Sequence, residues 1–321
     1  MLFGRKDPGR GYSLSRPVIF KKREDRLRVG GQAVIEGVMM RSPNSMAVAV
    51  RRPNGEIVVK RERLDFFSEK KLFSKLPLVR GVITLLSALV LGMKALNFSA
   101  NQSLEEEQEI SSWTMGLTFT LALCFGIFLF FLIPLFLTKW LRFTIPVVST
   151  SGILFNLVDG IIRLIIFLAY LWAISFFKEV RRIFQYHGAE HKSIFAFESG
   201  EVLAADRVRA FSYLHPRCGT SFLLIVMVVS ILVFALIPHQ LAFGYKVASR
   251  VVFIPLIAGL AYEIIRFADQ KRERKSMQYF IKPGLWLQRL TAREPSEDQI
   301  EVALRALEEV LELEERRRIG N

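Results

Sequence analysis

The sequence predicts a mainly α-helical protein with about four transmembrane helices, a small N-terminal β-hairpin region and a C-terminal cytoplasmic helix. Hydrophobic residues make up 51% of the 321 residues, a composition more apolar than soluble domains usually have. Four apolar segments each approach the roughly 20 residues that cross a bilayer. They lie at about 115–137, 152–176, 221–238 and 247–267. The net charge of +14 lies mostly outside these segments, as expected of loops and tails that face the cytoplasm.

The N-terminal 80 residues are expected to form a leader and a small β-containing region. Residues 1–28 are polar and basic, which predicts a disordered leader rather than a secretory signal peptide. Residues 29–80 are expected to be a cytoplasmic region with strands at 45–51 and 56–63. These strands flank Pro53-Asn54-Gly55, and an Asn-Gly pair between two strands is a strong hairpin signal.

Residues 81–112 are expected to form an interfacial or re-entrant helix followed by an acidic link. The apolar part, 82–98, is shorter than the other apolar segments. If it crossed the bilayer as a fifth span, the basic link 177–220 would face outward, against the preference of Lys and Arg for the cytoplasm. The prediction is therefore two pairs of transmembrane helices, in 113–176 and 221–267, with both chain termini in the cytoplasm.

Polar side chains within the second predicted span lie on one helix face. Asn156, Asp159 and Arg163 are spaced by three and four residues. Ionisable groups at membrane depth are costly unless they are paired. Because Asp159 and Arg163 stand at i and i+4, a structural ion pair is the favoured interpretation. An ion or proton pathway is the alternative.

Residues 268–321 are expected to be a cytoplasmic tail with an amphipathic helix. Ser296 and Gln299 have the spacing of a helix capping box. One apolar face follows, formed by Ile300, Ala303, Leu304, Leu307, Val310 and Leu311. This face predicts docking onto the rest of the chain or onto a partner protein. The basic residues elsewhere are expected to contact anionic lipid headgroups, and no motif indicates a nucleic-acid partner.

Metal-binding side chains gather in the link 177–220, which holds three of the four histidines of the chain. His187 and His191 are four residues apart, so both would lie on the same side of a helix and could bind one metal ion. Glu190 directly precedes His191. His-x-x-Glu-His is the arrangement of the inverted zincins, in which the glutamate is the general base that takes a proton from water.

Further ligands would decide whether such a site is catalytic or structural. The candidates are His215 and Cys218, three residues apart, and more distantly Glu198 and Glu263. Imidazole and thiolate ligands suit zinc. A zinc ion bound by both histidines of the pair together with His215 and Cys218 would be closed and structural, whereas three protein ligands would leave an open catalytic position. An acid–base site without metal and a chance match of a short motif are the alternatives.

Glu36 is a second candidate site residue. It stands among apolar neighbours in the glycine-rich stretch 30–43, and acids in apolar settings are rare unless they are paired or functional. One interpretation is an ion pair with one of the many arginines. The other is a catalytic residue brought beside Glu190.

Three motifs together resemble the bacterial YqhQ family. They are GGQAVIEGVMMRSP at 30–43, HGAEHK at 187–192 and HPRCGTSF at 215–222. The resemblance covers about 29–293 and implies a multi-pass protein of the bacterial inner membrane. Members of the family are commonly labelled predicted metal-dependent enzymes, and the resemblance implies no established substrate.

Two functions fit these features. The favoured one is a bacterial integral membrane protein whose cytoplasm-facing site binds Zn²⁺ or another divalent transition metal and acts as a hydrolase. Glu190, with Glu36 beside it, is then the expected catalytic residue. The expected metal ligands are His187, His191, His215 and Cys218. The alternative is a non-enzymatic assembly factor, scaffold or transporter component in which the same residues form a structural metal site or a polar contact.

Overall fold

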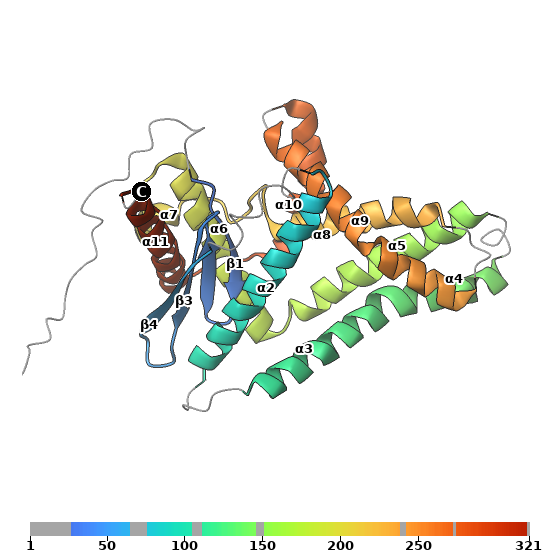
Figure 1. Cartoon of the computed structure of the whole chain (residues 1–321), viewed down its shortest axis with the longest axis horizontal. Helices are drawn as coiled ribbons and strands as arrows, with labels where there is room; N and C mark the ends of the chain where they lie inside the picture. Colours follow the sequence, from blue (N-terminus) through green and yellow to red (C-terminus); the bar gives the residue numbers. More distant parts are fainter. Residues whose placement is uncertain are drawn as a thin grey trace, which may run out of the picture.

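The structure is a computed structural model that describes residues 27–64, 76–104, 111–145, 151–237, 242–271 and 274–319. Most of the predicted leader (1–26) and most of the acidic link (105–110) lie outside the described residues. A four-stranded sheet and the helices packed on it form one end of the molecule, and most of the long apolar helices extend away from it (Figure 1). The mainly helical class and the N-terminal β region are therefore confirmed.

The sheet is antiparallel with strand order β1-β2-β3-β4. Its strands are β1 Gly30–Val34, β2 Gly37–Arg41, β3 Ser45–Arg51 and β4 Ile57–Arg63. The predicted hairpin is confirmed, since Arg51 pairs with Ile57 across the Asn-Gly turn. The predicted region is larger than one hairpin, because the glycine-rich stretch forms β1 and β2. A two-residue turn joins these strands and places Glu36 at a φ of 51°. This left-handed backbone conformation is usually adopted by Gly or Asn and is rare for Glu.

The middle strands of the sheet are buried on both faces. The side chains of one face pack against α6 Lys178–Ser199 and α11 Glu297–Ile319; they include Val38, Met40, Ala47 and Ala49. Those of the other face pack against α2 Val79–Gln102; they include Met39, Met46, Val48 and Val50. Burial on both faces explains the nearly continuous apolar run in β3, which a sheet with one wet face would not need.

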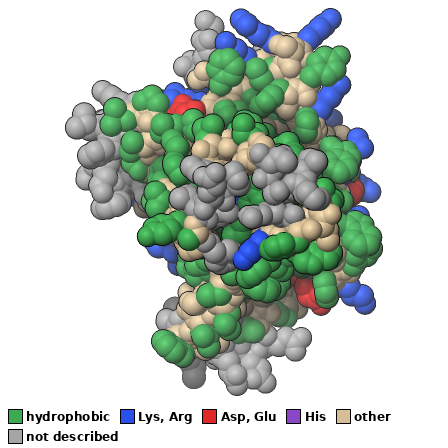
Figure 2. Space-filling model, turned by 90° about the vertical axis from the view of Figure 1, so that its right-hand side faces the viewer, with side chains coloured by type: hydrophobic (Ala, Val, Ile, Leu, Met, Phe, Trp, Pro, Cys, Tyr) green, Lys and Arg blue, Asp and Glu red, His purple; other side chains and the backbone are tan. Residues whose placement is uncertain are grey.

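The remaining helices complete the chain (Figure 1). They are α3 Ser112–Ile127, η3 Phe128–Leu132, α4 Ile133–Thr144, α5 Gly152–Ile174, α7 Ala205–Val208, α8 Gly219–Ala235, α9 Phe243–Gln270 and α10 Lys275–Thr291. Figure 2 looks onto the end of the molecule that lies to the right in Figure 1. Hydrophobic side chains cover most of the described surface there, with Lys and Arg mainly at its edges. Such a surface is typical of a protein embedded in lipid.

Four of the described helices are long and apolar enough to cross a membrane: Val79–Gln102, Gly116–Leu141, Gly152–Ile174 and Val247–Gln270. The number agrees with the prediction, but the set differs. The segment expected at the interface belongs to one of these helices, α2, because the helix continues past the apolar run at both ends. The segment predicted as the third span forms α8, an apolar helix of only 17 residues.

The predicted ion pair within the second span is confirmed, and a third charge joins it. The Asp159 carboxylate accepts a hydrogen bond from Arg163 and forms an ion pair with Arg250 of α9, both at 2.9 Å. All three side chains are at most 4% exposed. The polar face of α5 therefore ties α5 to α9, and Asn156 of the same face donates to the Ile237 carbonyl at 2.9 Å.

The C-terminal helix α11 packs on the chain's own sheet and on α6. The backbone N–H of Ser296 donates to the Gln299 side chain at 2.9 Å, which confirms this half of the capping box. The predicted apolar face is buried, with Ile300 and Leu307 fully covered. Glu314 on the same helix accepts from Ser42 and Ser45 at the start of the β3 hairpin, so polar contacts fix the helix to the sheet as well.

Candidate metal site

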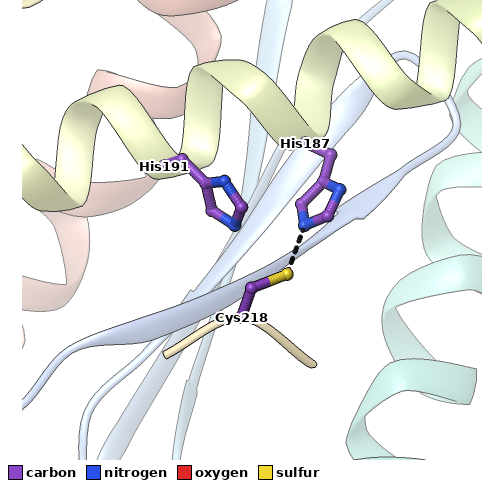
Figure 3. A group of neighbouring side chains, drawn as sticks. All are labelled: His187, His191 and Cys218. Atoms are coloured by element: carbon purple, nitrogen blue, oxygen red, sulfur yellow. Dashed lines mark hydrogen bonds between the residues drawn. The ribbon is translucent and has the colours of Figure 1, made fainter. Parts of the chain in front are cut away.

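Helix α6 carries the two histidines of the motif on one side. The helix is continuous from Lys178 to Ser199, so His187 and His191 stand one turn apart. Their ring centroids are 4.3 Å apart, and both rings point toward the same loop (Figure 3). The prediction that the two imidazoles share a helix face is confirmed.

Cys218 completes a three-residue group from the opposite side (Figure 3). It is the N-cap of α8 and is buried. The His187 Nε2 atom lies 3.1 Å from the Cys218 sulfur. One ligand atom from each of His187, His191 and Cys218 lies within 4.8 Å of the other two, close enough for the three residues to hold one metal ion.

Backbone carbonyls fix the orientation of both rings. Nδ1 of His187 lies 2.7 Å from the Thr291 carbonyl, and Nδ1 of His191 lies 2.6 Å from the Tyr213 carbonyl. A carbonyl can only accept, so each Nδ1 donates and each neutral ring keeps an unprotonated Nε2 directed at the group. Burial lowers the pKa of His191, which favours the neutral form that binds metals.

His215 lies beside this group but does not join it. Its ring centroid is 5.7 Å from that of His191. Nδ1 of His215 accepts from the Arg217 backbone N–H at 3.3 Å, and Nε2 lies 3.8 Å from the carboxylate of Glu198. The expected fourth ligand thus faces an acid, and Glu198, a more distant candidate, pairs with Arg217 and His215. The remaining candidate, Glu263, pairs with Arg80 at 2.6 Å.

Gln288 holds the loop that presents Cys218, a role that sequence reasoning missed. Its side chain accepts from the His215 N–H at 2.8 Å and donates to the His215 carbonyl at 2.8 Å and to Ser221 at 3.0 Å. It is fully buried. In the sequence, this role is indicated only by a glutamine beside Leu287 on the buried face of α10. Such a glutamine is weak evidence, because many helices carry a single glutamine.

Glu190 faces the sheet beside the histidines. It is 6% exposed, and the backbone N–H of Gly31 in β1 hydrogen-bonds to its carboxylate. A Cβ at Gly31 would come within 2.8 Å of the Glu190 side chain, so the glycine makes room for the acid. Burial raises the pKa of Glu190, while His187, His215 and the Gly31 N–H oppose that rise.

Glu36 is paired with an arginine and is not brought to the metal-ligand group. Its carboxylate accepts from Arg182 through both oxygens, one at 2.6 Å, and from the Tyr186 hydroxyl at 3.3 Å. Both partners precede the histidines on α6. Burial raises the pKa of Tyr186, which keeps its hydroxyl a donor. Glu36 lies in the β1–β2 turn, where its backbone is left-handed. Its contacts with Arg182 and Tyr186 therefore hold α6 in a fixed orientation on the sheet.

Gly188 lets another part of the chain cross α6 at the site. A Cβ at this position would lie 1.9 Å from the Arg293 carbonyl oxygen. The Arg293 N–H also donates to the Phe184 carbonyl of α6 at 2.9 Å. The glycine in the motif therefore serves close approach of the segment that carries Thr291, rather than a break in the helix.

The Gly188→Ala variant is expected to lose stability and to disturb His187. The added methyl would push away the backbone around Arg293 and with it the Thr291 carbonyl, and overpacking of this kind costs about 1–3 kcal/mol. Thermal unfolding of the purified protein should show a lower Tm. Gly126→Ala is the matched control, because nothing lies within 4 Å of a Cβ there. An unchanged Tm for Gly188→Ala would contradict the close approach.

Comparisons with known proteins agree with the extent of the resemblance. The profile of a family described as "Protein of unknown function (DUF1385)" matches residues 76–313, a range that includes the three grouped residues. The sequence is 33% identical over 306 residues to "Uncharacterized protein YqhQ" of Bacillus subtilis (strain 168), covering 89% of this chain and 92% of that protein. No solved structure matches.

Proposed function

This chain belongs to the DUF1385 family, and from that premise we propose that it is a bacterial membrane protein with a zinc-dependent hydrolytic site at the cytoplasmic face. The observation that carries the proposal is the convergence of His187, His191 and Cys218 within 4.8 Å. In a tetrahedral site with bonds of about 2.0–2.3 Å, neighbouring ligand atoms lie roughly 3.3–3.7 Å apart. Small side-chain movements would bring the three residues to that geometry.

The ligand set favours a catalytic site over a closed one. Zinc bound by three protein ligands acts as a Lewis acid at its open position and lowers the pKa of water there to about 7. His215 would have to leave Glu198 and the Arg217 N–H to close that position. Glu190 adjoins the ligands on α6 and is the residue we assign to accept a proton from water.

Charge and packing support the proposed cytoplasmic location of the site. The link that contains α6 carries Lys178, Arg181, Arg182, Lys192, Arg207, Arg209 and Arg217, whereas 138–151 carries only Lys139 and Arg142. The sheet, α6 and α11 also pack in one body, so both terminal parts of the chain share a side of the membrane. The positive-inside rule supports the proposal that this side is the cytoplasm.

The proposed partners are the lipid headgroups and a protein at α11. The basic residues on the cytoplasmic side would contact anionic headgroups of the inner leaflet. A protein partner at α11 would have to bind its outer, charged face, because the apolar face is used within the chain.

Cobalt substitution tests for the open position. We expect the Co²⁺-loaded protein to show a thiolate-to-metal charge-transfer band from Cys218 and d–d bands that change when acetohydroxamate is added, because that chelator needs a free coordination position. If the d–d bands do not change when acetohydroxamate is added, the metal has no free coordination position and the site is structural. That result is expected for a scaffold or assembly factor.

Glu190→Gln gives the second arm of this test. The variant should keep the cobalt bands of the wild type, since Glu190 is not a ligand. Zinc-dependent hydrolysis in a panel of ester, amide and phosphoester substrates should fall about 10²–10⁴-fold, the usual contribution of a general base. Unchanged hydrolysis would remove the role given to Glu190, and lost cobalt bands would make it a ligand instead.

A further inference from the structure

We propose that α2 does not cross the bilayer, although it is long enough, and instead lies on the cytoplasmic lipid surface with an exposed apolar stripe against the lipid. The stripe consists of Leu86, Leu89, Val90, Met93 and Leu96, which are 39–56% exposed. The inference concerns how the chain contacts the membrane and does not depend on metal binding.

The C-terminal half of α2 is fixed to the sheet. Leu91 and Ala95 are buried against it, and Gly92 packs against the side chain of Gln32 in β1. Lys94 pairs with Glu62 of β4 at 2.7 Å. Because the charged side chains of the sheet need water, the helix from Leu91 onward cannot lie in the hydrocarbon core.

The remaining part of α2 is too short to cross alone. Arg52, directly after β3, donates to Gln102 at 2.8 Å, so the helix stays beside the sheet to its last residue. Only residues 79–90 precede the contact with the sheet, and they make about 18 Å of helix. The hydrocarbon core is about 30 Å thick.

The order of the chain leads to the same conclusion. The sheet and α6 are in direct contact, as the Glu36 pair with Arg182 shows, so they lie on the same side of the membrane. An even number of crossings must therefore separate them. The continuous helix formed by α3, η3 and α4 is one crossing and α5 is the second, which leaves no crossing for α2.

The N-terminal end of α2 is anchored on that same side. Arg80 donates to Glu263 of α9 at 2.6 Å, and Gly81 packs against Tyr262. This part of α9 leads directly into the basic segment with Arg266 and Lys271, the expected cytoplasmic end of that helix. Both ends of α2 thus contact cytoplasmic parts of the molecule.

The exposed stripe then needs an apolar partner, and lipid fits it. The stripe lies opposite the face that carries Leu91 and Ala95, so the sheet cannot cover it. It begins within two turns of Gly81, which packs against Tyr262 of α9, so one end of the stripe lies beside a helix long and apolar enough to cross a membrane. The helix after α9, α10, exposes Tyr279 and Trp286, and aromatic residues are enriched at membrane interfaces.

Cysteine accessibility tests the crossing. In a Cys124→Ser background, Leu104→Cys after α2 should react with a membrane-impermeant maleimide only in inverted vesicles, as should Asn54→Cys in the β3–β4 turn. Ile145→Cys, after α4, should react only in right-side-out spheroplasts. Labelling of Leu104→Cys from outside, with Asn54→Cys labelled from inside, would overturn the proposal.

Nitroxide labels test the lipid contact. Leu86→Cys, Val90→Cys and Met93→Cys would be labelled in protein reconstituted into phosphatidylethanolamine–phosphatidylglycerol vesicles. All three should be accessible to oxygen and lie at a similar shallow depth, whereas Lys60→Cys on β4 should be accessible only from water. A crossing helix would separate the depths of Leu86 and Met93 by about 10 Å. Water access at the stripe, or spin–spin broadening from a second copy covering it, would equally overturn the lipid assignment.

Discussion

The Cys218→Ser variant is expected to purify with less than about one tenth of a zinc ion per chain after zinc loading, whereas the wild type should carry about one. The serine hydroxyl cannot replace the thiolate, which supplies one of three ligand atoms in the group. The two imidazoles that remain would bind zinc weakly. Metal analysis of the loaded and desalted protein measures the ratio.

The chain offers a matched control for this substitution. Cys124, the second cysteine, is exposed on α3, and Cys124→Ser should leave the zinc content unchanged. His187→Ala and His191→Ala should each repeat the loss seen with Cys218→Ser. A wild-type protein that retains no zinc after loading would end the metal proposal, and equal retention by Cys218→Ser would exclude the thiol as a ligand.

The Asp159→Leu variant is expected to be among the most destabilising single substitutions, at about 3–5 kcal/mol, because it leaves two buried arginines without a counter-charge. Arg163 and Arg250 share the Asp159 carboxylate, and both also lie against the ring of Phe234. Their mutual repulsion would act in a poorly polarisable environment. Thermal unfolding in detergent would record the loss as a lower Tm.

The order of related variants makes this prediction specific. Arg250→Leu leaves the neutral Asp159–Arg163 pair and should therefore cost less than Asp159→Leu. Glu312→Gln removes one partner of an exposed pair with Arg316 and should change the stability by less than about 1 kcal/mol. If Asp159→Leu were no worse than Arg250→Leu, the carboxylate would not be the group that compensates the two arginines.

Local patterns predicted the parts of the structure whose partners are close in sequence. The Asn54-Gly55 turn predicted the hairpin of β3 and β4. The spacing of His187 and His191 predicted that both rings lie on one side of α6. The Asp159–Arg163 pair also follows from one helical turn. In each case the backbone geometry of a single element decides where the side chain points.

Contacts between distant elements could not be predicted in this way. Arg250 reaches Asp159 from another helix, and Gln288 and Thr291 reach the site from α10, with no spacing rule to connect them. His215 was expected as a ligand because of its distance from Cys218 in sequence, yet the loop turns it toward Glu198. The Arg293 carbonyl that approaches Gly188 lies more than a hundred positions away in sequence, so the motif alone gives no sign of this contact.

The docking of α11 onto the sheet also bears on biosynthesis. The strands lie at 30–63 and α11, which covers one of their faces, lies at 297–319, so these contacts join parts of the chain that are far apart in sequence. Until Ile300 and Leu307 leave the ribosome, the apolar face of β2 and β3 has no cover from α11 and is a target for chaperones and proteases. The body that carries the histidines can therefore close only after α11 has been translated.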